Sequence, residues 1–378
     1  EKLKEVMKYE LKKIKKDYPM PRRTEIVDEI VDIKLDTTDL ITKENVMVAL
    51  SNEGYIKRVS MKSYTSSNGD ETTLKPGDYL KYLFEVSTLD NLVIFTNLGQ
   101  YLYVPVHTIF EGKWKDLGKH INNLVTGLSE SEYIVGAFIL KNPEEKITFV
   151  TKNGLVKQSI LKDFVVSRYS KAMLAFKLKD NDEVIAVNQS KPRTVLISEA
   201  GYYVNIDTEE IPVVGARASG VRGMNLKDDV LAAGLSLDSS EYLSIFTNNK
   251  TAKRVKVSEL ETHNRAKKGS TLIKKVKSFD YKIIKALLTD GKDELFLKCD
   301  NEITKIKNTD ISILDLKSTG GTISRYKIDD VFTSTVVDSS LKNNKDANEE
   351  VKTLEENTDK VVEEIQESEI EEKKEEKP

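Results

Sequence analysis

Cysteine, histidine and long apolar runs are all scarce in this sequence. The single cysteine, Cys299, excludes an internal disulfide framework. The three histidines, His107, His120 and His263, show no HxxxH or CxxC spacing, so no metal site is expected. The chain has no signal peptide pattern and no apolar run of 18 or more residues. We therefore expect a cytoplasmic protein without membrane insertion.

Groups typical of catalysis are equally rare. Cys299 lies in a β-prone run, where a nucleophile would still need a positioned base and an electropositive pocket, so a half-buried structural thiol is the favoured interpretation. No Walker loop is present, and the GxRxxGxxG run from Gly215 to Gly223 lacks the strand-to-helix context of a phosphate-binding fingerprint. We expect no catalytic residue and no cofactor in these residues.

The charge is small overall but unevenly distributed. The net charge is −3, whereas residues 345–378 hold 14 acids and 6 bases, a net of −8 that leaves +5 on the rest. This last segment also has few aromatics, so it cannot bury enough apolar surface to offset the entropy of ordering. The sequence predicts a mildly basic body followed by a disordered acidic tail.

Short β-prone segments on either side of a turn recur six times along the chain. In four of the six turns a glycine is available for a positive φ. The steps between turns are 45, 55, 47, 49 and 52 residues, a spacing typical of propeller blades or solenoids. The turns lie at Gly54, Gly99, Gly154, Gly201, Lys250 and Glu302.

A second marker follows each turn by 24 to 33 residues, namely an acidic residue before another apolar strand. Two markers in the same order, six times over, indicate a true repeat. The acidic residues are Asp78, Glu132, Asp182, Asp229, Asp280 and Asp330.

These repeats define three regions. Residues 1–39 contain an amphipathic helix over 1–17 and a linker, residues 40–340 contain the six β units, and residues 341–378 form the acidic tail. The chain begins without Met and in the middle of the helical pattern. We therefore expect a fragment whose helix belongs to an upstream domain.

Lysine and arginine recur after the turns and in the loops that follow them. If the units form a ring, equivalent positions fall on one rim and make a basic belt that can follow a phosphate backbone. The alternative is that these are ordinary solvated strand ends. Likewise, Trp114 and the tyrosines could stack on bases or belong to the core. The candidate DNA-binding residues are Lys57, Arg58, Lys113, Lys115, Lys119, Lys157, Arg168, Lys171, Arg217, Arg222, Lys253, Arg254, Arg265, Lys267 and Lys268.

The six-unit pattern, with GYYVNIDTEEIPVVGARASGVRGMNLKDDV (201–230) as its most specific stretch, resembles the C-terminal domain of bacterial type IIA topoisomerase A subunits. The opening EKLKEVMKYELKKIKKDYPMPRRTEI resembles the end of their DNA breakage and reunion domain. The resemblance implies an all-β, six-bladed β-pinwheel, a propeller-like disc whose blades exchange strands and whose basic edge bends duplex DNA.

Within this family, GYIKRVSMKSY and YLYVPVHTIFEGKWKDLGKHI are most similar to the topoisomerase IV A subunits of Gram-positive bacteria. The gyrase A subunit, which is the alternative, carries a basic QRRGGKG box in its first blade, where this chain has SYTSSNGDETT (63–73). We therefore expect a gap in the basic belt at the first blade, and strand passage (decatenation and relaxation for chromosome segregation) without negative supercoiling.

The resemblance also implies the partners. These are duplex DNA, a B subunit that carries ATP and magnesium, and a second copy of the A subunit in an A2B2 assembly associated with the chromosome. The cleavage tyrosine would precede residue 1, so this segment is non-catalytic within an ATP-dependent isomerase. A propeller-like scaffold that binds proteins is the alternative from another functional class.

Overall fold

The computed structural model describes residues 1–19, 41–68, 71–129, 131–179, 181–300 and 302–341. The chain divides into two compact units, residues 1–40 and 41–378. Most of the predicted linker, and all of the predicted acidic tail after residue 341, lie outside the described residues. No helix in the described ranges is long and apolar enough to cross a membrane.

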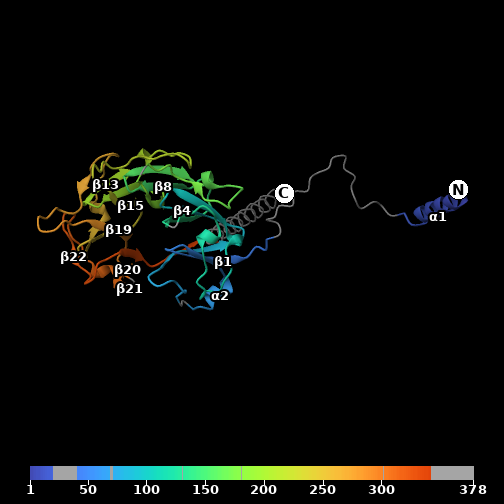
Figure 1. Cartoon of the computed structure of the whole chain (residues 1–378), viewed down its shortest axis with the longest axis horizontal. Helices are drawn as coiled ribbons and strands as arrows, with labels where there is room; N and C mark the ends of the chain where they lie inside the picture. Colours follow the sequence, from blue (N-terminus) through green and yellow to red (C-terminus); the bar gives the residue numbers. More distant parts are fainter. Residues whose placement is uncertain (20–40, 69–70, 130, 180, 301, 342–378) are drawn as a thin grey trace, which may run out of the picture. The chain divides into compact units, whose positions relative to one another are not determined.

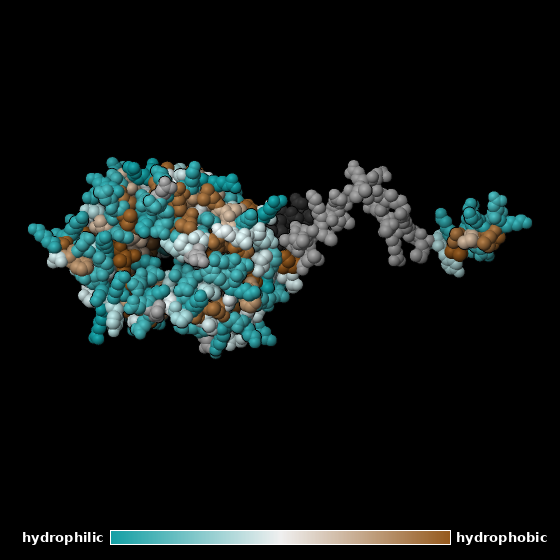
Figure 2. Space-filling model, viewed as in Figure 1, coloured by the Kyte–Doolittle hydropathy of each residue, from teal (hydrophilic) through white to brown (hydrophobic). Residues whose placement is uncertain are grey.

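Helix α1 (Lys2–Asp17) confirms the predicted amphipathic helix in the first unit. Its apolar side chains Leu3, Met7, Leu11 and Ile14 are all more than half exposed. Figure 2 shows apolar surface along this helix. None of its residues is buried.

The second unit is a six-bladed propeller in which each blade is built on one hairpin, and the colours of Figure 1 pass in chain order from blade to blade. Both faces of most hairpins are covered by neighbouring blades, which is why these strands are nearly continuous apolar runs. The hairpins of blades 1 to 6 are β1 (Asn45–Ser51) with β2 (Tyr55–Ser60), β4 (Asn91–Thr96) with β5 (Gln100–Pro105), β8 (Lys146–Thr151) with β9 (Leu155–Ile160), β12 (Arg193–Ser198) with β13 (Tyr202–Asp207), β16 (Tyr242–Thr247) with β17 (Thr251–Lys256), and β20 (Glu294–Cys299) with β21 (Glu302–Lys307).

All six predicted hairpins are present. Gly201 turns between β12 and β13 with φ +88°, and Lys250 adopts φ +61° where the other turns have glycine. The sixth turn lies before the predicted Glu302, because Glu302 is already the first residue of β21.

Five of the six predicted acidic markers precede the inner strand of their blade, and Asp330 is the first residue of its inner strand. Asp78, Asp182 and Asp229 each accept a hydrogen bond from a backbone N–H in the hairpin turn of their own blade. In blade 6 this bond is made by Asp329 rather than the predicted Asp330. These four carboxylates therefore hold the turns of blades 1, 3, 4 and 6. The inner strands are β3 (Leu80–Ser87), β7 (Ile134–Ile139), β11 (Val184–Gln189), β15 (Leu231–Leu237), β19 (Ile283–Thr289) and β23 (Asp330–Thr333).

The fourth, outermost strand of blades 1 to 5 comes from the following repeat. It lies in what we term the crossing loop, the segment between the second hairpin strand and the inner strand. The crossing loops of repeats 1 to 6 are residues 61–79, 106–133, 161–183, 208–230, 257–282 and 308–329. They supply β6 (Lys119–His120) to blade 1, β10 (Met173–Leu174) to blade 2, β14 (Val221–Arg222) to blade 3, β18 (Ser270–Thr271) to blade 4 and β22 (Gly321–Thr322) to blade 5.

Each crossing loop begins with a short helix, which is α2 (Met61–Thr65) in the first repeat and a single 3-10 turn in the others. Another 3-10 turn, η3 (Ile121–Asn123), follows β6. The turns after the later hairpins are η2 (Val106–Thr108), η4 (Leu161–Phe164), η5 (Thr208–Glu210), η6 (Val257–Glu259) and η7 (Asn308–Asp310).

The join between blades 6 and 1 is built differently. Strand β24 (Val337–Ser339) leaves blade 6 and pairs in parallel with β3 of blade 1. Tyr79 stacks on Phe332 at 3.6 Å between ring centroids, and its hydroxyl donates to Asp330 at 3.0 Å. The face of blade 1 away from blade 2 is covered by Trp114, by α2 and by β24. Trp114 is therefore a core residue.

Candidate nucleic-acid interface

The crossing loops bring cations to the outer edge of the propeller, because those of repeats 2 to 6 each contain the outermost strand of the preceding blade. Nine of the predicted DNA-binding residues are exposed there, and a tenth, Arg265, is half-buried. We term these ten residues the outer-edge cations. They are Lys113, Lys115 and Lys119 on blade 1, Arg168 and Lys171 on blade 2, Arg217 and Arg222 on blade 3, and Arg265, Lys267 and Lys268 on blade 4.

Strand exchange moves the predicted gap in the basic belt. The crossing loop of repeat 2, not that of repeat 1, covers the outer edge of blade 1 and supplies three lysines. The prediction of a gap at blade 1 is therefore wrong. In the described residues it is blade 6 that has three strands, with β21 at its edge.

The crossing loop of repeat 1 stays on its own blade, and it lacks a glycine that three other crossing loops have before the exchanged strand. In repeats 2, 5 and 6 the residue before the exchanged strand is a glycine with positive φ, and a Cβ there would come within 2.7 Å of a backbone oxygen of the preceding blade. Counting from the turns places Thr73 at the corresponding position of repeat 1. Its hydroxyl instead donates to the carbonyl of Lys115 at 2.6 Å, on blade 1.

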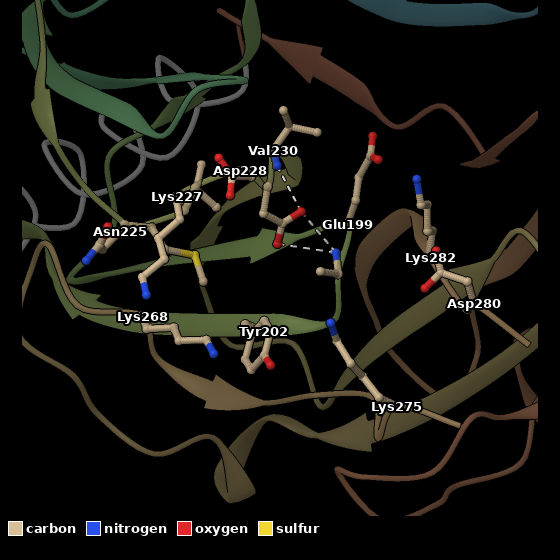
Figure 3. Close-up of a pocket in the computed structure, with 14 residues that line it drawn as sticks. Glu199, Tyr202, Asn225, Lys227, Asp228, Val230, Lys268, Lys275, Asp280 and Lys282 are labelled. Atoms are coloured by element: carbon tan, nitrogen blue, oxygen red, sulfur yellow. Dashed lines mark hydrogen bonds between the residues drawn. The ribbon is translucent and has the colours of Figure 1, made fainter. Parts of the chain in front are cut away.

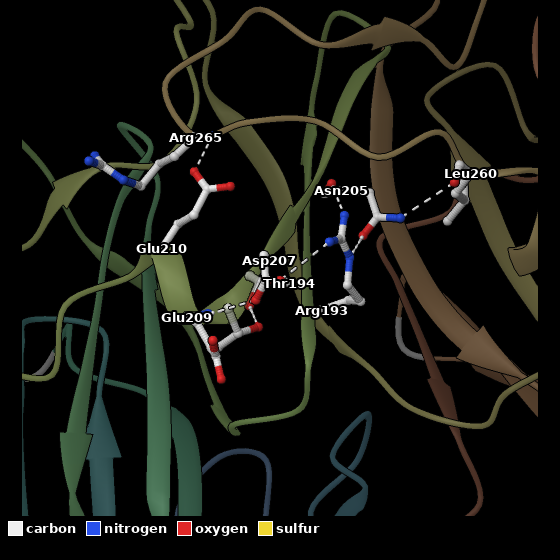
Figure 4. Close-up of polar contacts among 9 residues, drawn as sticks. Arg193, Thr194, Asn205, Asp207, Glu209, Glu210, Leu260 and Arg265 are labelled. Carbon is white, nitrogen blue, oxygen red and sulfur yellow. Dashed lines mark hydrogen bonds and ion pairs between the residues drawn. The ribbon is translucent and has the colours of Figure 1, made fainter.

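Neighbouring crossing loops contact one another along the edge. The Arg265 guanidinium donates to the carbonyl of Arg222 at 2.8 Å, which joins the edges of blades 3 and 4. The backbone N–H of Arg265 donates to Glu210 at 2.9 Å, as Figure 4 shows. These bonds hold the glycine-rich ARASGVRG and NRAKKGS loops together.

Aromatic rings support two of the outer-edge cations. The Lys268 ammonium lies 4.2 Å from the centre of the Tyr202 ring, and the Lys119 ammonium lies 4.7 Å from that of Phe110. Such cation–π contacts orient a lysine while leaving it exposed to solvent.

A hollow of about 370 Å³ lies beside Lys268 at the boundary of blades 4 and 5 (Figure 3). Three further lysines, Lys227, Lys275 and Lys282, line it together with acidic residues. These three were not predicted from the sequence, because they belong to two crossing loops and no local motif connects them.

Three of the predicted residues are not available to a phosphate. Lys57, Lys157 and Lys253 are at most 3% exposed, and each ammonium donates to oxygens of the crossing loops. Burial lowers the pKa of Lys57 and Lys157 to about 8 and that of Lys253 to about 7. These lysines lie on the second hairpin strand, where the crossing loops cover them.

The arginines next to these lysines connect successive repeats. Arg58 donates to the carbonyl of His107 at 3.2 Å and pairs with Glu111 at 2.7 Å. Arg254 is buried, donates to the carbonyl of Ile311 at 2.7 Å and lies over the Tyr242 ring. Both act as links between a blade and the loop that crosses it.

The remaining candidate groups have structural partners. His120 contacts the carbonyl of Glu53 at 2.9 Å, and His263 accepts from the backbone N–H of Asn205 at 3.2 Å. Cys299 is buried in the core between blades 5 and 6. Within the described ranges, no three His, Cys, Asp or Glu side chains are grouped in a way that could hold a metal ion.

The fold places this protein in the class of propellers whose blades exchange strands, and cations lie along its outer edge. Residues 90–141, 145–191, 194–236 and 241–290 match the family model described as "DNA gyrase C-terminal domain, beta-propeller". The chain belongs to this family, as the resemblance predicted.

Curated relatives include the A subunit of DNA topoisomerase 4 from Bacillus subtilis (strain 168), 37% identical over 298 residues that cover 78% of this chain and 37% of the relative. The same protein of Staphylococcus aureus (strain MRSA252) is 33% identical over 291 residues, covering 76% of this chain and 36% of the relative. The chain thus spans a little over a third of the length of these relatives.

Solved structures agree with the fold. A crystal structure of the C-terminal domain of DNA topoisomerase IV superposes with a TM-score of 0.74 at 33% identity, covering 78% of this chain and 94% of that one. A DNA gyrase A C-terminal domain superposes with a TM-score of 0.57 at 21% identity, covering 78% and 100%, a likeness of fold alone. The chain is thus similar to the C-terminal domain of the topoisomerase IV A subunit.

Proposed function

We propose that this chain is the region of a topoisomerase IV A subunit that binds and bends duplex DNA and positions it for ATP-dependent strand passage. The strand passage would unlink catenated circles and relax supercoils during chromosome segregation. The cleavage tyrosine would lie upstream, ATP and magnesium on the B subunit, and the working assembly would be A2B2 on the chromosome in the cytoplasm.

The observation that carries this proposal is the run of outer-edge cations over four successive blades. A rigid curved edge with exposed cations at successive positions suits the phosphate backbone, which presents regularly spaced charges regardless of sequence. A Cβ at Gly215, two residues before Arg217, would meet nothing within 4 Å, so the backbone of this loop is open to a phosphate there.

Duplex binding by the whole 378-residue chain tests the proposal, with two unrelated DNA sequences and salt between about 50 and 200 mM. Affinity should fall steeply with salt and be equal for both sequences. Replacing Arg222 and Lys268 by Glu should weaken both complexes alike and lower the slope of log K against log salt by roughly 2, since each phosphate contact contributes about 0.9.

The matched control reverses two exposed lysines, Lys141→Glu on the connection between blades 2 and 3 and Lys146→Glu at the start of β8. It makes the same change in net charge away from the outer edge and should leave the slope unchanged. If both double variants lose the same affinity for duplex DNA, the DNA does not bind at the outer edge. A protein partner bound without any DNA affinity would favour the scaffold function.

A further inference from the structure

A buried lysine occupies the same strand position in alternate blades. Lys57, Lys157 and Lys253 each lie three residues after the hairpin turn, in blades 1, 3 and 5. The corresponding residues of blades 2 and 4 are Leu102 and Val204. An apolar side chain therefore suffices to build a blade at this position, and a lysine must overcome the cost of desolvation there.

Each ammonium donates to oxygens of two successive crossing loops, that of its own repeat and that of the next. Lys157 Nζ lies 2.7 Å from the carbonyl of Ala175, 2.7 Å from that of Ala216 and 3.1 Å from that of Gly215. The three N–H groups of one ammonium thus match three acceptors.

The two other lysines repeat this arrangement. Lys253 Nζ lies 2.7 Å from the carbonyls of Leu272 and Leu316 and 3.1 Å from that of Asp315. Lys57 Nζ donates to the carbonyls of Trp114 and Asp116 and to the hydroxyl of Thr72.

An exposed cation adjoins the bonded carbonyls in each of these three loops. Arg217 follows Gly215 and Ala216, and Lys317 follows Asp315 and Leu316. Lys115 lies between Trp114 and Asp116. The matching residues of the loops that cross blades 2 and 4 are Ser170 and Ala266. At this loop position, a cation therefore occurs in the three loops that bind a buried lysine, whereas the loops over blades 2 and 4 carry their cations at neighbouring positions.

The backbone geometry gives this pairing a physical reason. Carbonyls that are held inward by an ammonium fix the peptide planes on which the next residue is built, so that its side chain leaves the loop in a set direction. Burying the lysine therefore costs desolvation free energy in the blade, whereas its hydrogen bonds order the outer loop.

We propose that Lys57, Lys157 and Lys253 are positioning residues for phosphate contacts made by Lys115, Arg217 and Lys317. Alternate blades then present contact points that are ordered before DNA arrives, and binding there does not have to immobilise a flexible loop. This inference rests on the proposed function and names the interior residues on which its outer edge depends.

A double-mutant cycle between Lys157→Met and Arg217→Gln tests the coupling, with duplex affinity measured across a salt series. Lys157→Met should lower affinity on the order of threefold while leaving the salt slope unchanged, because the phosphate contact still forms. Arg217→Gln should lower the slope by about 0.9. In the Arg217→Gln background, Lys157→Met should have no further effect.

The control cycle pairs Lys157→Met with Lys267→Gln on the loop over blade 4, where losses should add. If Lys157→Met only loosens the propeller in general, its coupling to Arg217→Gln and its coupling to Lys267→Gln will be equal. Equal coupling in the two cycles would overturn the inference. If Lys157→Met fails to fold by circular dichroism, Lys253→Met with Lys317→Gln provides the equivalent cycle in blade 5. If the unsubstituted chain does not bind duplex DNA, the proposed function is refuted. If it binds DNA but the losses from Lys157→Met and Arg217→Gln simply add, this inference alone is refuted.

Discussion

At the scale of single residues, Gly269 shows how closely a crossing loop approaches the preceding blade. It has φ +82°, and a Cβ there would lie 1.9 Å from the carbonyl oxygen of Tyr203. We expect Gly269→Ala to lower the free energy of unfolding by roughly 2 kcal/mol or more, since both backbone strain and a clash result. Gly215→Ala, where a Cβ meets nothing within 4 Å, should change it little. Urea denaturation of both variants compares them directly, and equal losses would contradict this account.

The buried lysines should make stability depend on pH. Burial lowers the pKa of Lys253 from 10.5 to about 7, so between these pH values the unfolded chain binds more protons at this residue than the folded chain does. The contribution of Lys253 to the free energy of unfolding therefore rises with pH between about pH 7 and pH 10.5, and it is constant below pH 7. We expect the unfolding free energy of the native chain, relative to Lys253→Met, to increase from pH 7 to pH 9.5. A flat difference would show that Lys253 stays protonated.

Sequence reasoning about residues succeeded in the loops and failed on the strands. Arg217, Arg222 and Lys268 are exposed at the outer edge, as expected of charges in glycine-rich loops. Lys157 and Lys253 were predicted to bind DNA because equivalent positions in a ring of units fall on one face of it, where a basic belt can follow a phosphate backbone. Strand exchange covers that face with a segment from another repeat, and no local pattern reveals it.

At the scale of elements, β24 is a short strand that joins the two ends of the propeller. It pairs with β3, and Ser340 donates to Asp90 at 2.7 Å immediately after it. Truncation after Leu341 should leave the thermal midpoint unchanged, whereas truncation after Val336 removes β24 and should lower it by several degrees. Scanning calorimetry of the two chains provides the comparison. A large drop for the longer chain would mean that the acidic segment contributes to the folded unit.

The repeat itself was predictable element by element, because turn glycines, β-prone runs and acidic markers are local signals. The blade with which each crossing loop pairs was not predictable, because this pairing joins residues that are far apart in the sequence. The expected gap at blade 1 was misplaced for this reason: residues 63–73 do lack basic side chains, but the loop over blade 1 comes from repeat 2.

At the scale of the whole molecule, the series of exchanged outer strands is interrupted at blade 6 in the part of the chain that the structure describes, and the crossing loop of repeat 1 has no arginine and no double glycine. Bending DNA through a large angle costs on the order of several kcal/mol, which contacts on every blade would be needed to offset. Supplied with ATP and the B subunit, the full-length protein should unlink catenated circles and relax supercoils without driving relaxed plasmid to negative supercoiling. Gel analysis of topoisomers distinguishes these products, and efficient negative supercoiling would indicate gyrase.

Strand exchange also gives the chain a direction of assembly. Because the outer strand of each of the first five blades lies in the following repeat, a blade that leaves the ribosome first keeps an open edge until about twenty further residues after the next turn have been synthesised. Each new repeat completes the one before it, and a ribosome that stalls between repeats leaves one unpaired strand exposed. In the described residues, β21 of blade 6 pairs with no outer strand, so this edge stands outside the series.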